Sequence, residues 1–249
     1  MAGKVHIIVP DSHAHPDFNN NRYTWLGRLI ADIQPDVVVD IGDFFDMASL
    51  CSYDKGKKSF EGRRYHRDIA AGVEAQDRMF KPIKARKRKL PRFVRCLGNH
   101  EDRINRAISL DPILDGTIGL NDLQSADYGF EQYDYKTIVN VDGVNYSHVL
   151  TSGVKGLPVT SANLMLAKQH ESCTMGHAHT FDYSIQAKAS GGHLHGLICG
   201  VFQDYHADFA GPANEMWRPG VVVKRNVEAG NYDLEWISLK RLMEAYGDK

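Results

Sequence analysis

Residues 93–101, FVRCLGNHE, join a short apolar run to a glycine, a carboxamide, an imidazole and a carboxylate. The apolar run predicts a buried strand, so the polar side chains stand where that strand ends. The same order occurs at residues 5–13, VHIIVPDSH, at 37–46, VVVDIGDFFD, and at 173–179, CTMGHAH. Four predicted strand ends therefore carry side chains that can bind a ligand.

Helical segments separate the first three of these strands. Residues 23–33 place leucine and isoleucine at helical spacing before Pro35, and residues 69–83 also predict a helix. The order strand, helix, strand, helix, strand predicts an α/β sheet with helices on its faces.

The second half of the chain is richer in strands. Residues 136–141 and 144–149 flank an Asp-Gly turn, which is a strong hairpin signal. Residues 221–227 and 232–239 predict a closing hairpin.

Composition is that of an ordinary globular protein. The chain has 249 residues, of which 43% are hydrophobic and 24% charged. We expect a single domain over 1–249, with a basic insertion at about 51–95 and a candidate cap segment at about 104–130. The longest apolar runs fall short of the roughly 18 residues of a membrane span, and 5–9 is too short for the core of a signal peptide. We therefore expect a cytoplasmic protein without a membrane partner.

The polar clusters offer the donors of a metal site. Ligands gather at the carboxyl ends of the strands in α/β sheets, so clusters far apart in sequence can meet in space. Carboxylates, imidazoles and a carboxamide suit Mn²⁺, Fe or Zn²⁺, and no thiolate is among them. Gly42, Gly98 and Gly176 each precede a candidate ligand. We expect these glycines to supply positive φ for a sharp turn from strand to ligand.

This order of motifs resembles the calcineurin-like metallophosphoesterase superfamily, which includes DNA-repair nucleases, cyclic-nucleotide phosphodiesterases and Ser/Thr phosphatases. The family pattern is D-x-H, GD-x-x-D, GNH-[DE], a lone histidine and GH-x-H, and here it runs from Asp11 to His179. Residues from about 52 to 106 also resemble bacterial and bacteriophage members. The resemblance implies a mixed β-sandwich flanked by helices, with a two-metal site at the strand ends.

The resemblance also implies a role for each matching position. It implies two divalent ions, Mn²⁺ first, with Fe, Zn²⁺ or Ni²⁺ as alternatives. The implied metal ligands are Asp11, His13 and His179 for one ion, Asn99, His148 and His177 for the other, and Asp43 as the bridge between them. His100 would face the substrate phosphate, and Asp46 would hydrogen-bond His100 and fix its orientation.

The lone histidine departs from the family pattern. Members often have glycine directly after it, whereas Val149 follows His148 and the next glycine is Gly153. His170 is the competing candidate, but it lies in a polar stretch with no strand before it. We take His148 as the ligand.

The ligand set predicts a phosphoesterase that works by attack of a metal-bound hydroxide. His100 could stabilise the transition state or protonate the leaving oxygen. We expect phosphodiester substrates, in nucleic acid or nucleotides. The alternative is a phosphomonoesterase acting on nucleotides or phosphoproteins; against phosphoproteins, Met47 follows Asp46 where the family's protein phosphatases usually have arginine. A non-catalytic interaction module is a third reading, which the intact ligand set argues against.

The charge is distributed unevenly. Residues 55–95 contain 15 lysines and arginines against 4 acidic residues, a local charge of +11 in a chain of net charge −1. This asymmetry favours a polyanionic partner such as DNA or RNA, although a solvated helix face would look the same. The predicted substrate-binding residues are Lys84, Arg86, Lys87 and Arg88.

A second H-x-H, at His193 and His195, places both histidines on one face of a predicted strand. The pair could line the cleft or lie on the surface. The sequence leaves this choice and the oligomeric state open.

Overall fold

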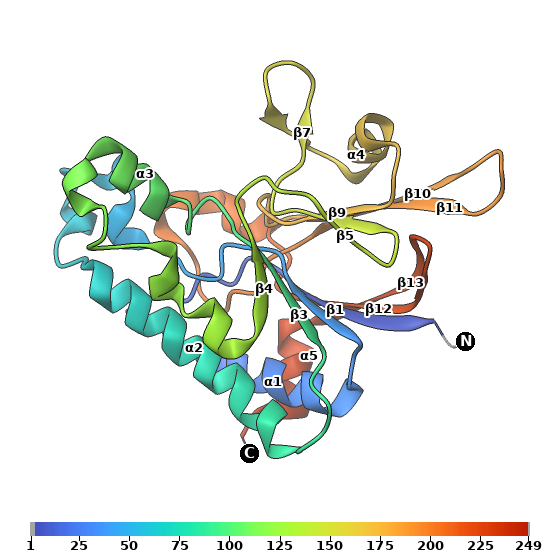
Figure 1. Ribbon diagram of the computed structural model, residues 1–249, viewed down its shortest axis with the longest axis horizontal. Coiled ribbons are helices and arrows are strands. Elements are labelled where there is room, and N and C mark those ends of the chain that lie inside the picture. The colour runs from blue at the N-terminus through green and yellow to red at the C-terminus, as the bar shows by residue number, and fades with distance from the viewer. Residues whose placement is uncertain (1–2, 249) are drawn as a thin grey trace.

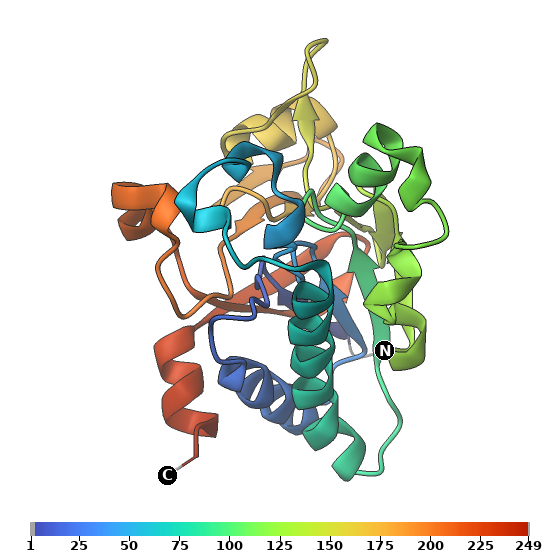
Figure 2. The same ribbon diagram turned by 90° about the vertical axis from the view of Figure 1, so that its left-hand side faces the viewer.

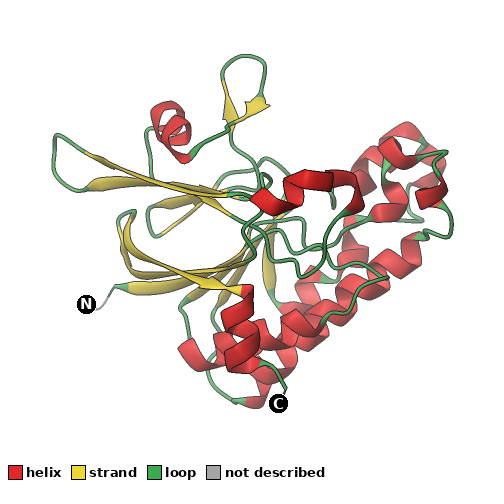
Figure 3. Ribbon diagram, turned by 180° about the vertical axis from the view of Figure 1, so that it is seen from behind, coloured by secondary structure: helices red, strands yellow, loops and turns green. Residues whose placement is uncertain are grey.

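The computed structural model describes residues 3–248 and shows a mixed α/β arrangement, with two main sheets and helices outside them (Figures 1 and 3). The α/β class expected from the sequence is confirmed. Within the described residues, no helix is long and apolar enough to cross a membrane.

The first sheet, counted over residues 3–248, has six strands in the order β13-β12-β1-β2-β3-β4. They are β1 (Lys4–Val9), β2 (Val37–Asp40), β3 (Arg92–Cys96), β4 (Phe130–Tyr133), β12 (Gly220–Glu228) and β13 (Asn231–Ser238). Strands β1 to β4 run parallel, with Ile8 beside Val39 and Val39 beside Val94. Their carboxyl ends therefore share one edge of the sheet.

The second sheet has five strands in the same described range, in the order β10-β11-β9-β6-β5. They are β5 (Val139–Val141), β6 (Val144–Tyr146), β9 (Cys173–Met175), β10 (Phe181–Ala187) and β11 (His193–Cys199). Strands β6, β9 and β11 are parallel, so β6 and β9 also end at a common edge. A small hairpin of β7 (Thr151–Ser152) and β8 (Leu157–Pro158) lies apart from both sheets.

Helices cover the outer faces of the two sheets. The α-helices are α1 (Asn21–Ile33), α2 (Tyr65–Ala85), α3 (Arg103–Leu110), α4 (Ala162–Gln169) and α5 (Leu239–Tyr246). Short 3-10 helices span Ala48–Leu50, Ser52–Asp54, Lys58–Phe60, Pro112–Leu114, Leu120–Leu123, Ser125–Tyr128 and Asp208–Met216. Helices α1, α2 and α5 lie on the side of the first sheet, with α1 and α2 next to each other, and α4 packs on β10 and β11 (Figures 1 and 2).

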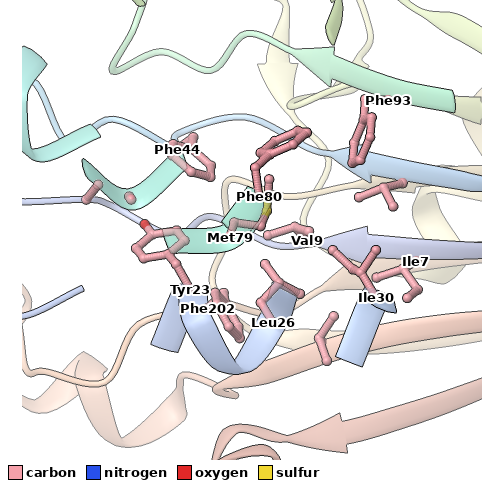
Figure 4. Close-up of a cluster of buried hydrophobic side chains, with 14 of the residues drawn as sticks. Ile7, Val9, Tyr23, Leu26, Ile30, Phe44, Met79, Phe80, Phe93 and Phe202 are labelled. Carbon is pink, nitrogen blue, oxygen red and sulfur yellow. The ribbon is translucent and has the colours of Figure 1, made fainter. Parts of the chain in front are cut away.

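The largest apolar core lies between the first sheet and helices α1 and α2 (Figure 4). Ile7 of β1, Leu26 of α1 and Phe80 of α2 are all buried in it. A Cβ on Gly27 would lie 2.1 Å from the carbonyl oxygen of Met79, so this glycine lets α1 and α2 approach closely. The contact fixes α2 against the sheet.

A second apolar core fills the space between the two sheets. Successive residues of a strand face opposite ways, so Ile7 packs toward the helices while Ile8 joins Val144 and Leu197 between the sheets. A third cluster, with Met165 and Ile198, lies beneath α4. These cores hold the ends of strands from both sheets at one place.

One lysine is buried between the sheets. Lys224 of β12 is fully buried, and its Nζ donates a hydrogen bond to the hydroxyl of Thr174. Its Nζ lies 4.2 Å from the ring centre of Tyr232 and 4.6 Å from that of Tyr146. No carboxylate pairs with it among the described residues. Burial lowers the pKa of Lys224 well below its usual value.

The structure corrects some element boundaries. The strand expected at 136–141 begins only at Val139, because the backbone turns at Lys136, whose φ is 70°. The strand expected at 144–149 ends at Tyr146. Strands β4 and β10 and helix α4 had no counterpart among the expected elements. That 51–95 is an insertion and 104–130 a cap stays a prediction.

Candidate metal centre

The carboxyl ends of strands from both sheets meet at one cluster of donors. Within residues 3–248, three groups of buried histidines and aspartates each hold their ligand atoms within 4.8 Å of one another. The groups are Asp11, His13 and His179; His13, Asp43 and His100; and Asp11, Asp43 and His148. We use the name metal centre for the seven residues Asp11, His13, Asp43, Asn99, His148, His177 and His179. Buried groups of this kind could hold a metal ion.

The first part of the metal centre joins the ends of β1 and β9. The Nε2 atom of His179 lies 3.2 Å from Oδ2 of Asp11 and 3.1 Å from Nε2 of His13. Bonds of about 2.1 Å to a shared ion, at right angles, place two donor atoms about 3 Å apart. The Oδ1 atom of Asp11 is buried with no hydrogen-bond partner in the described part of the chain. A cation would balance this carboxylate, so the donor set fits a metal.

The second part joins the ends of β3, β6 and β9. The Oδ1 atom of Asn99 lies 3.1 Å from Nε2 of His148 and 2.8 Å from Nδ1 of His177. His148 donates from Nδ1 to the carbonyl oxygen of Ile41, at 3.1 Å, which turns its Nε2 toward the centre. The competing residue, His170, is exposed at the end of α4.

Asp43 stands between the two parts. Its Oδ2 atom lies 3.4 Å from Nε2 of His148 and 3.7 Å from Nε2 of His100. Its Oδ1 atom accepts a hydrogen bond from the backbone N–H of His100 at 2.8 Å. Burial first, and the nearby Asp11 second, raise the pKa of Asp43 well above its usual value. A divalent cation would favour the charged form instead.

Two histidines of the centre, His13 and His177, favour the neutral form. Burial is the main cause that lowers the pKa of His177 to about 4, and His148 is the next. Burial also lowers the pKa of His13. Neutral imidazole is the form that binds metals, so these shifts suit the ligand role.

Four of the ligands have backbones in the left-handed region. Their φ angles are 45° at His13, 53° at Asp43, 67° at His177 and 60° at His179. Residues other than glycine reach this region at a cost of the order of 1 kcal/mol or more each. The surrounding cores therefore hold the ligands in backbone conformations that the residues do not prefer.

Positive φ at the three motif glycines was expected, and this is right only at Gly42, whose φ is 106°. It is wrong at Gly98 and Gly176. A Cβ on Gly98 would lie 2.0 Å from Oδ1 of Asp43, and one on Gly176 would lie 2.1 Å from Oδ1 of Asp11. These two glycines leave room for the carboxylates.

The environment of His100 differs from the expected one. Its Nδ1 donates to the backbone carbonyl oxygen of Asp46 at 2.6 Å. The carboxylate of Asp46 lies 3.8 Å from that Nδ1, beyond hydrogen-bond reach, and 3.4 Å from Nδ1 of His13. The main chain of Asp46 thus orients His100, while its side chain faces His13. Burial first, and Arg103 second, lower the pKa of His100 well below its usual value.

Glu101 had no expected role. It is fully buried, and its carboxylate accepts hydrogen bonds from the backbone N–H groups of Gly98 (2.8 Å), Asp43 (3.0 Å) and Phe45 (2.8 Å). The residue stands in the quoted GNHE motif, but its partners come mostly from the loop after β2. Burial, then Asp43 and Asp40, raise the pKa of Glu101 to about 7. Glu101 ties the two ligand-bearing loops together.

A cleft of about 530 Å³ opens beside His100 and Asp46. Four lysines and arginines line it, namely Lys57, Arg63, Arg67 and Arg103. Another wall carries Phe18 and Tyr205, whose rings stack at 3.7 Å and 6°. A separate cavity of about 500 Å³ is lined by Trp217, whose ring meets the His179 ring edge-on at 4.4 Å. The cleft thus opens on the side of the centre that carries His100.

The predicted substrate-binding residues Lys84, Arg86, Lys87 and Arg88 lie far from this cleft. Asp68, near the start of α2, lines the cleft, and 16 residues at about 1.5 Å each separate it from Lys84 along the helix axis. Arg88 donates to Gln34 at the end of α1, so the group lies near the amino ends of β2 and β3 (Figure 1).

The second H-x-H pair also lies away from the metal centre. His193 and His195 are at the amino end of β11, which runs parallel to β9, whereas the ligands follow the carboxyl end of β9. Nδ1 of His195 instead hydrogen-bonds the hydroxyl of Tyr183 at 2.6 Å.

No protein-family model matches this chain, and no match is found among curated proteins.

Proposed function

We propose that this protein is a two-metal phosphoesterase of the calcineurin-like metallophosphoesterase superfamily, with its mixed β-sandwich fold, acting on phosphodiesters of nucleotides or nucleic acid. The observation that carries the proposal is the position of Asp43 between two sets of donors. One carboxylate has two oxygens, and a pair of ions roughly 3.5–4 Å apart needs such a bridge.

The metal centre supplies a complete set of oxygen and nitrogen donors. Asp11, His13 and His179 would hold one ion, Asn99, His148 and His177 would hold the other, and Asp43 would serve both. Mn²⁺ is the proposed ion, since the set contains no thiolate. When bound, the ions would activate water at neutral pH and neutralise charge on the phosphate oxygens.

The surrounding residues position this chemistry. His100 donates from Nδ1 to the carbonyl oxygen of Asp46, and its Nε2, which accepts a hydrogen bond from Arg103, lies on the side of Asp43 and the cleft. We propose that His100 meets the phosphate there. Glu101 holds the loops of Asp43 and His100 in register, so the bridge and the phosphate-facing ring keep a fixed relation.

The cleft supports a diester over a monoester. Its lining includes His100, Arg67 and Phe18, and its volume of about 530 Å³ is well beyond the space that one phosphate needs. A diester carries a group on each side of phosphorus, and the cleft offers room for the second group. A monoester would leave that room unused.

The test is a substrate panel with the Mn²⁺-loaded protein. It compares bis-p-nitrophenyl phosphate, p-nitrophenyl phosphate, cyclic nucleotides, RNA, and single- and double-stranded DNA, with Asp43→Asn as the inactive control. Faster turnover of diesters supports the proposal. Preference for p-nitrophenyl phosphate would indicate a monoesterase, and no turnover of any substrate would favour an interaction module.

A further inference from the structure

Arg103 is the first residue of α3 and follows the GNHE motif closely. Its Nη1 group donates to the carbonyl oxygens of Asp46, at 2.9 Å, and Met47, at 3.2 Å. Its Nη2 group donates to Nε2 of His100 at 3.1 Å. The guanidinium is thus held against the residue that we place at the phosphate.

Arg103 differs from the other cations of the cleft. Lys57 and Arg63 both pair with Asp54 at 2.9 Å, and Arg67 pairs with Asp17 at 3.1 Å. Of the four lysines and arginines that line the cleft, Arg103 is the one without an ion pair to any described residue. Its guanidinium thus lies beyond ion-pair distance of every described carboxylate, although its charge acts on the nearby Asp43.

The donors of Arg103 are only partly used. A guanidinium has five N–H donors, and three of them go to the two carbonyls and to His100. Among the described residues, Nε–H and one Nη2–H have no partner. A phosphate has two oxygens that can accept such a pair together, and arginine favours this bidentate contact.

We infer that Arg103 is a substrate-binding residue that grips the non-bridging oxygens of the phosphate beside His100. The inference rests on the proposed function and deepens it. The carbonyls of Asp46 and Met47 fix the guanidinium in place before the substrate arrives, so little side-chain freedom is lost on binding.

The test compares Arg103→Gln and Arg103→Lys with Arg106→Gln, an exposed arginine on the same helix that does not line the cleft. Calorimetry measures the binding of inorganic phosphate to the Mn²⁺-loaded proteins. Kinetic assays with bis-p-nitrophenyl phosphate measure KM and kcat. In Arg103→Gln we expect both the phosphate Kd and KM to rise by roughly 10- to 100-fold, with a smaller rise in Arg103→Lys, because lysine keeps the charge and loses the fork. Arg106→Gln should match the wild type.

Metal content and melting temperature distinguish a phosphate-binding role of Arg103 from a purely structural one. The inference predicts two bound metals and a nearly unchanged Tm in Arg103→Lys. Unchanged phosphate affinity in both Arg103 variants, loss of metal in proportion to activity, or no phosphate binding by the wild type would each overturn it. A wild type that binds phosphate through Arg103 but hydrolyses no ester would instead refute the proposed function alone.

Discussion

Glu101 accepts a hydrogen bond from the backbone N–H of Asp43 at 3.0 Å, a contact between residues 58 positions apart. The same carboxylate also accepts from Gly98 and Phe45. The loop that carries Asp43 is therefore fixed to the loop that carries Asn99 and His100.

The first prediction concerns this contact. Glu101→Ala leaves three backbone N–H groups without an acceptor, so the free energy of unfolding should fall by roughly 2–5 kcal/mol. Urea unfolding measures it, with Asp102→Ala as the control, since among the described residues the Asp102 side chain accepts a hydrogen bond from Asn105 alone. A loss below about 1 kcal/mol would mean that the loops keep their positions without the clamp.

The second prediction concerns Asp43 and metal. Without a cation, burial and Asp11 raise the pKa of Asp43, so its charge at neutral pH costs stability. Asp43→Asn removes this buried charge, so it should stabilise the metal-free protein. With Mn²⁺ the wild type should instead be more stable than Asp43→Asn, because the wild type binds the ions and gains stability by mass action. Thermal scans with chelator and with Mn²⁺ compare the melting temperatures of the two proteins. If the same protein melts at the higher temperature in both scans, Asp43 does not have a bridging role.

The third prediction separates His100 from Asp46. His100→Asn should lower kcat by roughly 10²- to 10⁴-fold and keep the metal stoichiometry of the wild type. Asp46→Asn should instead weaken metal binding, because the Asp46 carboxylate lies nearer to His13 than to His100. Elemental analysis together with kinetics distinguishes the two. Loss of one metal equivalent in the His100 variant would make it a ligand.

The fourth prediction concerns the basic residues at the carboxyl end of α2, which is the end away from the cleft. Reversing Lys84, Arg86, Lys87 and Arg88 to Glu should leave kcat/KM for a small diester within about 2-fold of the wild type, since about 25 Å of helix separates them from the cleft. Polynucleotide binding is measured against salt in the same variant. If these charges track a phosphate backbone, affinity falls and the salt slope flattens. Identical salt curves in both proteins would remove the four residues from any nucleic-acid surface.

The fifth prediction concerns Lys224. Its pKa in the folded protein is lowered by burial, so over the pH range between that value and about 10.4 the unfolded chain binds one more proton than the folded one. Wild-type stability should therefore fall as pH falls through that range, and Lys224→Met should remove this loss. We expect the variant to be more stable than the wild type at pH 7 and the difference to be smaller at pH 10. The control is Lys240→Met, at a side chain that is 82% exposed. If the difference in stability between Lys224→Met and the wild type does not change with pH, Lys224 stays charged in the folded protein.

The sequence predicted the elements in which local pattern and burial agree. The apolar runs before Asp11, Asp43, Asn99 and His177 are strands buried on both faces, so continuous hydrophobicity marked them. Strand β10 lies at a sheet edge and is only half-buried, and its mixed pattern gave no such signal.

The site was predictable as a set of residue types, but its contacts were not. The role of Glu101 depends on N–H groups of a distant loop, and that of Asp46 on which histidine its carboxylate faces. The predicted nucleic-acid contacts near Lys84 rest on a local run of charge, and that run did not show that helix α2 carries Lys84 about 24 Å from the cleft. Such features depend on three-dimensional placement, which local composition does not encode.

The left-handed backbones of His13, Asp43, His177 and His179 bear on how this protein would respond to selection. Glycine tolerates positive φ and asparagine accepts it more readily than most residues, so either would relieve the chain at these positions. In a saturation library sorted only for the amount of folded protein, glycine and asparagine should become enriched at all four sites. Sorting the same library for turnover should remove them. The positions where abundance and activity demand opposite residues would then outline the metal centre without any structure in hand.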